Sequence, residues 1–368
     1  MSKRIFLSPP HMSGKELKYI EEVFESNYIA PVGNFVDKFE KDICTYSGSK
    51  YALATVNGTS AIHLALRVLG IGEDDIVLAS SFTFIGSVSS ILYQHAKPYF
   101  IDSDKKSWNI SPTLLKRAIE NSPTKPKALV LTHLYGQSAN LEKIVKVCKE
   151  NDIYLIEDAA ESLGATYNKK HTGTFGDLGI YSFNGNKLIT TSSGGMLVSD
   201  NKEWMDKARF YATQAKDDAP YYEHTELGYN YRMSNILAAV GVAQLEVVDD
   251  RIKKCKEVFS WYQEELSGIK EVTFMPELEA SSGNRWLTTL VLEKTRPDIL
   301  IDTLSSKNIE SRRLWKPMHL QTLFQDTLCE VNGVSEELFK KGLCLPSGTE
   351  LSRQDVKFIC NIIKEVLI

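Results

Sequence analysis

An aspartate and a lysine follow two apolar segments in the middle of the chain, and together they could serve a cofactor that needs both an anion and an amine. Asp158 ends the apolar run in IYLIED, and Lys187 follows GIYSF and a turn that contains Gly185. Strands of one sheet would deliver both side chains to a single crevice. A carboxylate can keep a pyridinium nitrogen protonated, and a lysine amine can bond covalently to an aldehyde. Pyridoxal phosphate has both requirements.

Each of these residues also has a simpler interpretation. Asp158 could be the N-cap of a helix over AAESLG, and Lys187 could be a solvated surface charge. The small residues from Thr190 to Gly195 permit the close approach of a bulky ligand, and this context favours the cofactor interpretation.

A phosphate could bind at Asn57-Gly58-Thr59-Ser60, which separates the strand-like YALATV from the helical AIHLALRVLG. The amides at a helix N-terminus and two hydroxyls form an anion site there, and Ser182 could also donate. Ordinary capping by Thr59 or Ser60 is the alternative. The sequence contains neither GxGxxG nor GxxxxGK[ST], which disfavours dinucleotide and Walker-type sites.

Two further residue types have less specific patterns. Phe84, in SFTF beside a predicted sheet edge, could stack on a planar ring, although core packing would explain it equally well. No cluster of His, Cys or acidic residues has the spacing of metal ligands, so no metal site is predicted.

Strand-like and helical segments alternate from Tyr51 onward, with helices predicted over 85–95, 112–121 and 141–150. The strand-like segments include DIVLAS, KPYFID, KALVLTH, IYLIED and GIYSF. Continuous Val, Ile and Leu runs are typical of strands buried on both faces, so an α/β domain with a mostly parallel sheet is predicted. A long helical tract follows Arg232, and a smaller α+β pattern comes after Gly268. We therefore expect a large cofactor-binding α/β domain over 1–248 and a small C-terminal α+β domain over 249–368.

The composition favours small molecules as partners. The chain has 43 Lys and Arg against 47 Asp and Glu, a net charge of −4, which predicts neither a nucleic-acid groove nor an anionic membrane surface. Its six cysteines form no CxxC pair, so no disulfide framework is predicted. The N-terminal residues do not form a signal-peptide pattern and no apolar run reaches spanning length, so the expected location is the cytoplasm.

Six motifs, in their order along the chain, resemble the DegT type of pyridoxal-phosphate-dependent aminotransferases of fold type I, which act on nucleotide-linked keto-sugars. They are NGTSA, SFTF, IEDAAESLGA, GTFGDLGIYSFNGNK, TTSSGGM and LGYNYRMSN, and the resemblance covers nearly the whole chain. It is strongest to the branch that makes UDP-4-amino-4,6-dideoxy-N-acetylglucosamine for UDP-N-acetylbacillosamine and protein glycosylation, through SPPHM, ELKYIEEVF, SNYIAP, RLWKPMH and LPSGT.

The resemblance implies an activity and an assembly. An amino group would pass from L-glutamate to C4 of UDP-4-keto-6-deoxy-N-acetylglucosamine, with the cofactor alternating between pyridoxal phosphate and pyridoxamine phosphate, in a homodimer with shared active sites. A different nucleotide-linked keto-sugar, with a C3 ketone or a dTDP group, and a non-catalytic regulator that binds the cofactor are the alternatives. A related sugar 3-dehydratase carries His at the lysine position, and Lys187 argues against that activity.

The resemblance also implies residue roles. Lys187 would bond to the cofactor and move protons, Asp158 would pair with its ring nitrogen, and Phe84 would cover its ring. Glu161, often Gln in relatives, would lie near the ring hydroxyl. Phosphate contacts would come from Gly58, Thr59, Ser60 and Ser182, and from Asn230 of the neighbouring subunit. The UDP or sugar contacts would come from Asn27, Tyr28, Ile29, Asn184, Arg285, Arg313, Trp315 and His319.

Three positions depart from the common family pattern: Glu161, Asn184 where SFH is usual, and Ser192-Ser193 where Gly-Glu is usual. Asn184 cannot titrate near neutrality as a histidine can. Because the bacillosamine branch also shows Asn before GNK, we interpret Asn184 as the mark of a subgroup.

Overall fold

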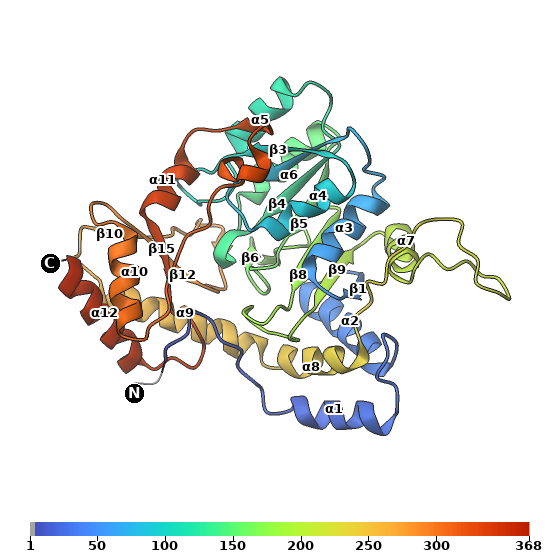
Figure 1. The fold of residues 1–368 in the computed structure, drawn as a ribbon, viewed down its shortest axis with the longest axis horizontal. Helices are drawn as coiled ribbons and strands as arrows, with labels where there is room; N and C mark the ends of the chain where they lie inside the picture. Colours follow the sequence, from blue (N-terminus) through green and yellow to red (C-terminus); the bar gives the residue numbers. More distant parts are fainter. Residues whose placement is uncertain (1–3, 368) are drawn as a thin grey trace.

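The computed structural model describes residues 4–367, and its largest feature is an eight-stranded sheet (Figure 1). The strand order is β1-β9-β8-β5-β4-β2-β3-β14, and all neighbours are parallel except that β9 runs antiparallel to β1 and β8. The strands are β1 Tyr51–Thr55, β2 Ile76–Ser80, β3 Lys97–Ile101, β4 Ala128–Thr132, β5 Tyr154–Asp158, β8 Leu178–Ser182, β9 Gly195–Ser199 and β14 Leu328–Glu330. This confirms the predicted α/β class with a mostly parallel sheet.

Both faces of the sheet are covered by helices, which explains why its strands are almost uniformly apolar. Along β4, Val130 packs in the core under α3, α4 and α7, whereas Leu129 and Leu131 pack in the core under α5 and α6. At the other end of the sheet α2 and α8 cover the same face as α5 and α6, and α1 packs on α8. These helices are α1 Glu16–Glu25, α2 Asn34–Ser47, α3 Gly58–Val68, α4 Ser89–Tyr93, α5 Pro112–Asn121, α6 Leu141–Glu150, α7 Lys202–Ala212 and α8 Asn235–Leu245.

Two of the predicted helices have the bounds expected from the sequence, and two predictions need correction. Helices α5 and α6 occupy 112–121 and 141–150. The helix predicted over 85–95 is divided into a 3-10 turn, Ile85–Ser87, and the short α4, because Val88 between them has a non-helical φ of −120°. The long tract after Arg232 likewise consists of two helices, α8 and α9. They are separated at Val247, whose backbone is not helical (φ −115°, ψ 11°).

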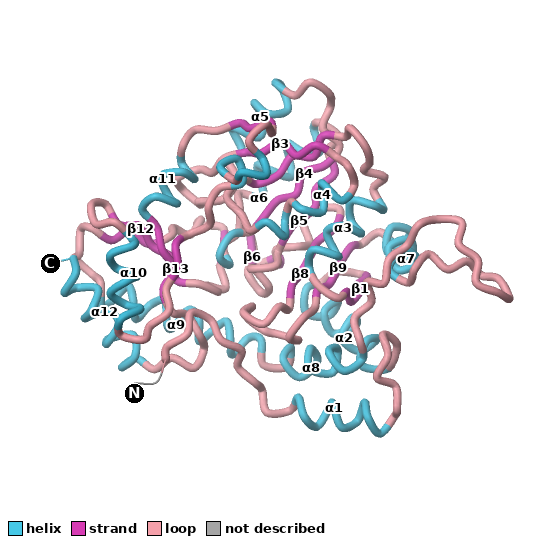
Figure 2. The backbone as a smooth tube through the Cα atoms, in the orientation of Figure 1, coloured by secondary structure: helices cyan, strands magenta, loops and turns pink. Residues whose placement is uncertain are grey.

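A smaller antiparallel sheet in the C-terminal part has the order β10-β12-β15-β13 (Figure 2). Helices α9, α10 and α12 pack with it around a separate apolar core. Its elements are β10 Val272–Phe274, β12 Thr288–Leu292, β13 Arg312–Arg313, β15 Gly342–Leu345, α9 Val248–Glu265, α10 Pro297–Ser306, α11 Val334–Lys341 and α12 Arg353–Leu367. The remaining elements are a three-stranded sheet of β6 Thr166–Tyr167, β7 Lys170–His171 and β11 Ser281–Ser282, and 3-10 turns at Leu134–Gly136, Met318–Leu320 and Thr322–Phe324.

The chain crosses between the two regions more than once. The expected boundary after residue 248 falls at the start of α9, yet β14 returns to pair with β3 at the edge of the large sheet. The buried carboxylate of Asp102, just after β3, accepts hydrogen bonds from the Gly333 and Ser335 amides at the start of α11. These contacts tie the small region to the large sheet. Among residues 4–367, no helix combines the length and apolar character needed to cross a bilayer.

Candidate active site

A pocket of about 320 Å³ opens at the edge of the large sheet where its parallel strands end. Thr132, Asp158 and Ser182 are the last residues of β4, β5 and β8, and all three line it. Because parallel strands carry their final side chains to one edge, the topology alone brings these groups together. The remaining lining residues are Asn57, Gly58, Thr59, Ile62, Phe84, Gly86, Ser87, Ala160, Glu161, Asn184, Asn186, Lys187, Ser193, Trp286 and Trp315.

Lys187 presents its amine to this pocket in a largely enclosed position, with 14% of its side chain exposed. Its Nζ lies 3.7 Å from Glu161 Oε1 and 4.2 Å from the centroid of the Trp286 ring. Glu161 is buried, and its Oε2 accepts a 2.6 Å hydrogen bond from the Tyr135 N–H. Burial raises the pKa of Glu161, while the charge of Lys187 acts in the opposite direction. The amine thus lies within reach of a buried carboxyl group whose pKa is raised.

Asp158 is buried at the end of β5, and its Oδ1 accepts a 3.0 Å hydrogen bond from the Ala160 N–H. Residues 159–164 form turns and no helix, so the alternative that Asp158 caps a helix is wrong. The turn closes because the aspartate side chain binds the amide two residues later. The same hydrogen bond fixes the carboxylate at the pocket wall.

The start of α3 forms another part of the pocket wall. Asn57 is the N-cap, since its Oδ1 accepts the Ser60 N–H at 2.8 Å, so the interpretation of Thr59 or Ser60 as the cap is wrong. Thr59 and Ser182 line the pocket, and within residues 4–367 neither hydroxyl hydrogen-bonds to another residue. A Cβ on Gly58 would come within 3.2 Å of the Ser182 Cβ. This close, donor-rich corner at a helix N-terminus suits a phosphate group.

Aromatic side chains enclose the pocket from the solvent side. Phe84 is half exposed, and its ring centroid lies 5.3 Å from that of Trp315. Trp286, which is 2% exposed, donates from Nε1 to the Asn186 carbonyl at 2.7 Å. The lining residues that were not predicted from the sequence include Thr132, Asn186 and Trp286. Only the folded chain shows which residues of a strand end or a distant loop reach the pocket.

The structure brings nine of the predicted site residues into this one pocket and leaves eight outside it. Those inside are Gly58, Thr59, Phe84, Asp158, Glu161, Ser182, Asn184, Lys187 and Trp315. Ser60 is outside because it lies within the first turn of α3, where its amide serves the helix cap. Asn27, Tyr28 and Ile29 are in the exposed loop between α1 and α2.

Three predicted substrate residues do not line this pocket, and their side chains have partners elsewhere in the chain, so their substrate contacts stay predictions. Arg285 pairs with Glu277 at 2.6 Å inside the small region. Arg313 donates twice to the Asp298 carboxylate, at 2.7 and 2.6 Å. His319 lies next to Ser81, with Nδ1 2.6 Å from the serine Oγ.

Asn230 is exposed at the base of the long segment that projects from the body between α7 and α8 (Figure 2). Its backbone bridges Thr213, on the other side of the same segment. It does not line the pocket of its own subunit, so its predicted contact with the neighbouring subunit stays a prediction.

A buried contact between Glu157 and His133 lies next to the end of β5 and was not predicted from the sequence. Glu157 is fully buried and accepts hydrogen bonds from His133 Nε2 at 2.8 Å and from the Gly173 and Gly176 amides at 2.9 and 2.7 Å. Burial raises the pKa of Glu157, but the His133 contact and the two amides outweigh it, and the pKa is lower than usual. Because Glu157 precedes Asp158, this network holds the end of β5.

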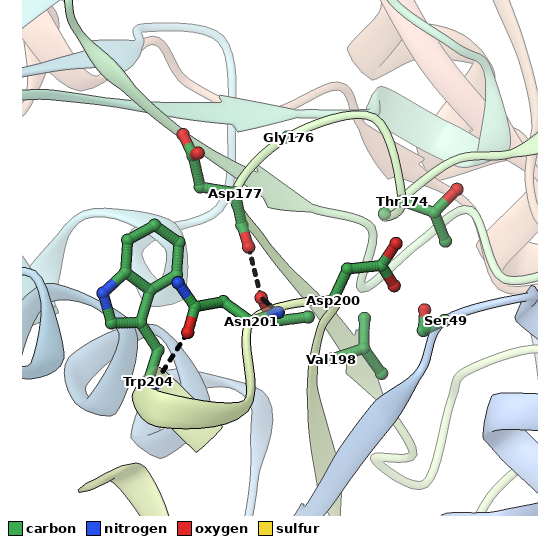
Figure 3. A pocket seen from close by; sticks show the side chains of 10 residues that line it. Ser49, Thr174, Gly176, Asp177, Val198, Asp200, Asn201 and Trp204 are labelled. Carbon is green, nitrogen blue, oxygen red and sulfur yellow. Dashed lines mark hydrogen bonds between the residues drawn. The ribbon is translucent and has the colours of Figure 1, made fainter. Parts of the chain in front are cut away.

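A second hollow, of about 520 Å³, lies at the opposite edge of the sheet, where β8 begins (Figure 3). Its acidic side chains already serve the backbone: Asp177 Oδ2 accepts from the Leu155 N–H and Asp200 Oδ1 from the Lys50 N–H. Asn201 caps α7 through the Trp204 N–H. Among the lysines of residues 4–367, none lines this hollow.

Comparison with known sequences identifies similar proteins along nearly the whole chain. The sequence profile of the DegT/DnrJ/EryC1/StrS aminotransferase family matches residues 10–364. The chain is 50% identical to a putative pyridoxal phosphate-dependent aminotransferase, EpsN, of Bacillus subtilis, over 96% of this chain and 94% of the relative. It is 36% identical to GDP-perosamine synthase of Escherichia coli O157:H7, over 99% and 98%. Identity to UDP-4-amino-4,6-dideoxy-N-acetyl-beta-L-altrosamine transaminase of Campylobacter jejuni is 30%, over 91% and 90%.

Comparison with solved structures gives the same fold. A DegT DnrJ EryC1 StrS aminotransferase from Brucella abortus superposes with a TM-score of 0.90 at 27% identity, over 96% of this chain and 95% of that one. This superposition over nearly the whole of both chains supports the predicted fold type I α/β class.

Proposed function

This chain belongs to the DegT/DnrJ/EryC1/StrS aminotransferase family and is a pyridoxal-phosphate-dependent sugar aminotransferase, and from that premise we propose a specific reaction for it. The amino donor is L-glutamate, and the acceptor is the C4 ketone of UDP-4-keto-6-deoxy-N-acetylglucosamine. The observation that carries the proposal is the single pocket in which Lys187, Asp158 and the N-terminus of α3 meet.

The groups in the pocket fit the cofactor. We assign its phosphate to the corner formed by Gly58, Thr59 and Ser182, where two hydroxyls and the helix N-terminus supply donors. Asp158, buried at the end of β5, is the group that would face the ring nitrogen. When bound, pyridoxal phosphate supplies an electron sink that stabilises negative charge on the substrate carbon and carries the amino group between the two substrates.

Lys187 is the proposed catalytic residue. Its amine would hold the cofactor between turnovers, and as a free amine it would take the proton from the α-carbon of glutamate, which would leave as 2-oxoglutarate after hydrolysis. Glu161 Oε1, 3.7 Å from Nζ, is close enough to steady the ammonium form. In the second half-reaction the C4 ketone oxygen of the acceptor would leave as water, and the Lys187 ammonium would give a proton to C4.

We assign the sugar and its nucleotide to the open side of the pocket, where Asn184, Trp315 and Phe84 lie. Aromatic side chains there can cover an apolar sugar face, and Asn184 offers a neutral hydrogen bond. A homodimer completes the proposal, in which Asn27, Tyr28, Ile29 and Asn230 face the neighbouring subunit's pocket. The exposure of Tyr28 (59%) and Ile29 (49%) is consistent with such an interface.

The choice of UDP rests on the bacillosamine-branch motifs and on the UDP-amino-sugar transaminase of Campylobacter jejuni. A GDP-linked keto-sugar is the second candidate, because the chain is 36% identical to a GDP-perosamine synthase.

The test is transfer of ¹⁵N from labelled glutamate to UDP-, GDP- and dTDP-linked keto-sugars by the cofactor-loaded protein, with NMR of each product. The proposal expects nitrogen at C4 of the UDP-sugar, with kcat/KM at least about tenfold above the GDP- and dTDP-sugars. Preference for the GDP-sugar would favour the second candidate. Bound cofactor without transfer to any keto-sugar would instead support a regulator.

A further inference from the structure

Tyr135 has an unusual backbone conformation at the wall of the pocket. It lies in the Leu134–Gly136 turn after β4, with φ 51° and ψ 26°, in the left-handed region that aromatic residues rarely occupy. Its side chain is 1% exposed, and its ring packs edge-on against Phe82. Strained backbone that persists in a folded protein is over-represented at functional sites. This raises the question of what the conformation achieves.

The left-handed turn directs its backbone groups toward Glu161 and Asn284. The Tyr135 N–H donates to Glu161 Oε2 at 2.6 Å. The next carbonyl, of Gly136, accepts the Asn284 N–H at 3.0 Å. A Cβ on Gly136 would lie 1.9 Å from Asn284 Oδ1, so the approach requires glycine. Asn284 in turn donates to the Glu161 carbonyl and accepts from the Trp286 N–H.

The Tyr135 side chain contacts a second residue that lines the pocket, Trp315. Its hydroxyl accepts the Trp315 N–H at 2.8 Å, and the two rings are stacked with centroids 6.2 Å apart and an interplanar angle of 12°. Trp315 follows β13 of the small sheet, whereas Tyr135 follows β4 of the large one. The contact therefore holds Trp315, which comes from the small region, against a residue that follows a strand of the large sheet.

We propose that Tyr135 is a positioning residue for the transamination site: its backbone N–H fixes Glu161 on the cofactor side, and its hydroxyl and ring fix Trp315 on the sugar side. The inference rests on the proposed function in assigning those two sides. Tyr135 does not line the pocket and acts only through the two residues that do. Removing the hydroxyl affects the Trp315 contact and leaves the N–H to Glu161 in place, so the two effects can be separated.

The experiment compares Tyr135→Phe with Tyr262→Phe in the full-length protein loaded with pyridoxal phosphate. Tyr262 is a matched control, because it is fully buried and its hydroxyl donates to the Pro346 carbonyl at 3.0 Å, in the small-region core. Both variants lose one buried hydroxyl hydrogen bond, so both are expected to lower Tm by a few degrees (roughly 2–5 °C).

The two variants are expected to differ at the pocket. In Tyr135→Phe, kcat/KM for the UDP-keto-sugar half-reaction should fall about tenfold, the effect of one lost hydrogen bond at Trp315. The dissociation constant of the cofactor, measured by equilibrium dialysis, and kcat/KM for glutamate should stay within about twofold. Tyr262→Phe should leave all three quantities within about twofold. Equal losses in both half-reactions, or a Tyr135→Phe variant that behaves as the control, would overturn the inference.

A double-mutant cycle with Trp315→Ala tests whether Tyr135 acts through Trp315. In that background Tyr135→Phe should change the keto-sugar kcat/KM by less than about twofold, whereas an undiminished tenfold loss would contradict positioning through Trp315. A wild-type protein that aminates no keto-sugar would refute the proposed function itself. Failure of the cycle in an active wild type would refute only the role of Tyr135.

Discussion

Two hollows lie at the two ends of strand β8. They differ in whether their polar side chains already have hydrogen-bond partners within the protein. At the start of β8, the larger hollow holds Asp177 (Figure 3). The carboxylate of Asp177 already accepts the Leu155 N–H. At the end of β8, the smaller pocket holds Ser182, whose hydroxyl hydrogen-bonds to no other residue of the described chain, and an enclosed amine from Lys187. The chemistry of a binding site therefore follows from unsatisfied groups at strand ends and not from the volume of a cavity.

The substitution with the largest expected effect on turnover at the pocket is Lys187→Arg. An arginine keeps a positive charge near Glu161 but stays protonated, so it cannot bond to the cofactor or accept a proton from the substrate. We expect the variant to bind the cofactor and to lose at least about 10²-fold in kcat, the scale of a lost acid–base group. Loss of the covalent bond should appear in the absorbance spectrum of the bound cofactor. Near-normal turnover would show that the pocket at the end of β8 is not the catalytic one.

The second test concerns how the free energy of unfolding depends on pH through Glu157, which contacts His133 next to the end of β5. The pKa of Glu157 is lowered in the folded state, so its ionised form stabilises the fold above the ordinary carboxyl range. This contribution is lost as the pH falls through that range to the lowered pKa. Urea unfolding from pH 7 to pH 3 should therefore show a falling free energy of unfolding.

Glu157→Gln tests the assignment of that loss to Glu157. The amide keeps one acceptor oxygen but loses the charge, so at pH 7 we expect a loss of about 3 kcal/mol, as when one partner of a buried pair is removed. The difference between variant and wild type should shrink toward pH 3. A difference that stays constant with pH would mean that the Glu157 charge does not contribute.

Sequence patterns predicted which residues share this pocket where one strand end determines a position. Asp158 and Ser182 end apolar segments, and parallel pairing of β5 with β8 is sufficient to bring them together. Trp286 could not be found in this way, because its position depends on Asn284 and on a turn whose left-handed conformation at Tyr135 has no sequence signal. Arg285 was expected at the pocket, yet Glu277 and the Phe259 ring hold its guanidinium elsewhere.

The same limit applies to the fold. Helices α5 and α6 were predictable because each begins at a clear cap, Ser111 and Asn140, and keeps one apolar face. The return of the chain to the large sheet as β14 was not, because a three-residue strand carries no periodic signal and is fixed by its pairing with β3. Local patterns determine the elements, and long-range pairing determines which elements meet.

The smallest expected effect belongs to the hollow at the start of β8. Burial raises the pKa of Asp177, with the Leu155 amide acting in the opposite direction, so folding favours its protonated form. The stability linked to that proton is present at low pH and is lost as the pH rises through the raised pKa. Asp177→Asn keeps an oxygen for the Leu155 N–H and removes the charge, so at pH 7 the free energy of unfolding should be unchanged or higher by up to about 1 kcal/mol. Turnover should stay within about twofold, since Asp177 lies at the edge of the sheet away from Lys187. Urea unfolding and steady-state kinetics on the same sample measure both quantities, and a large loss of turnover at unchanged stability would mean that the two hollows are functionally coupled.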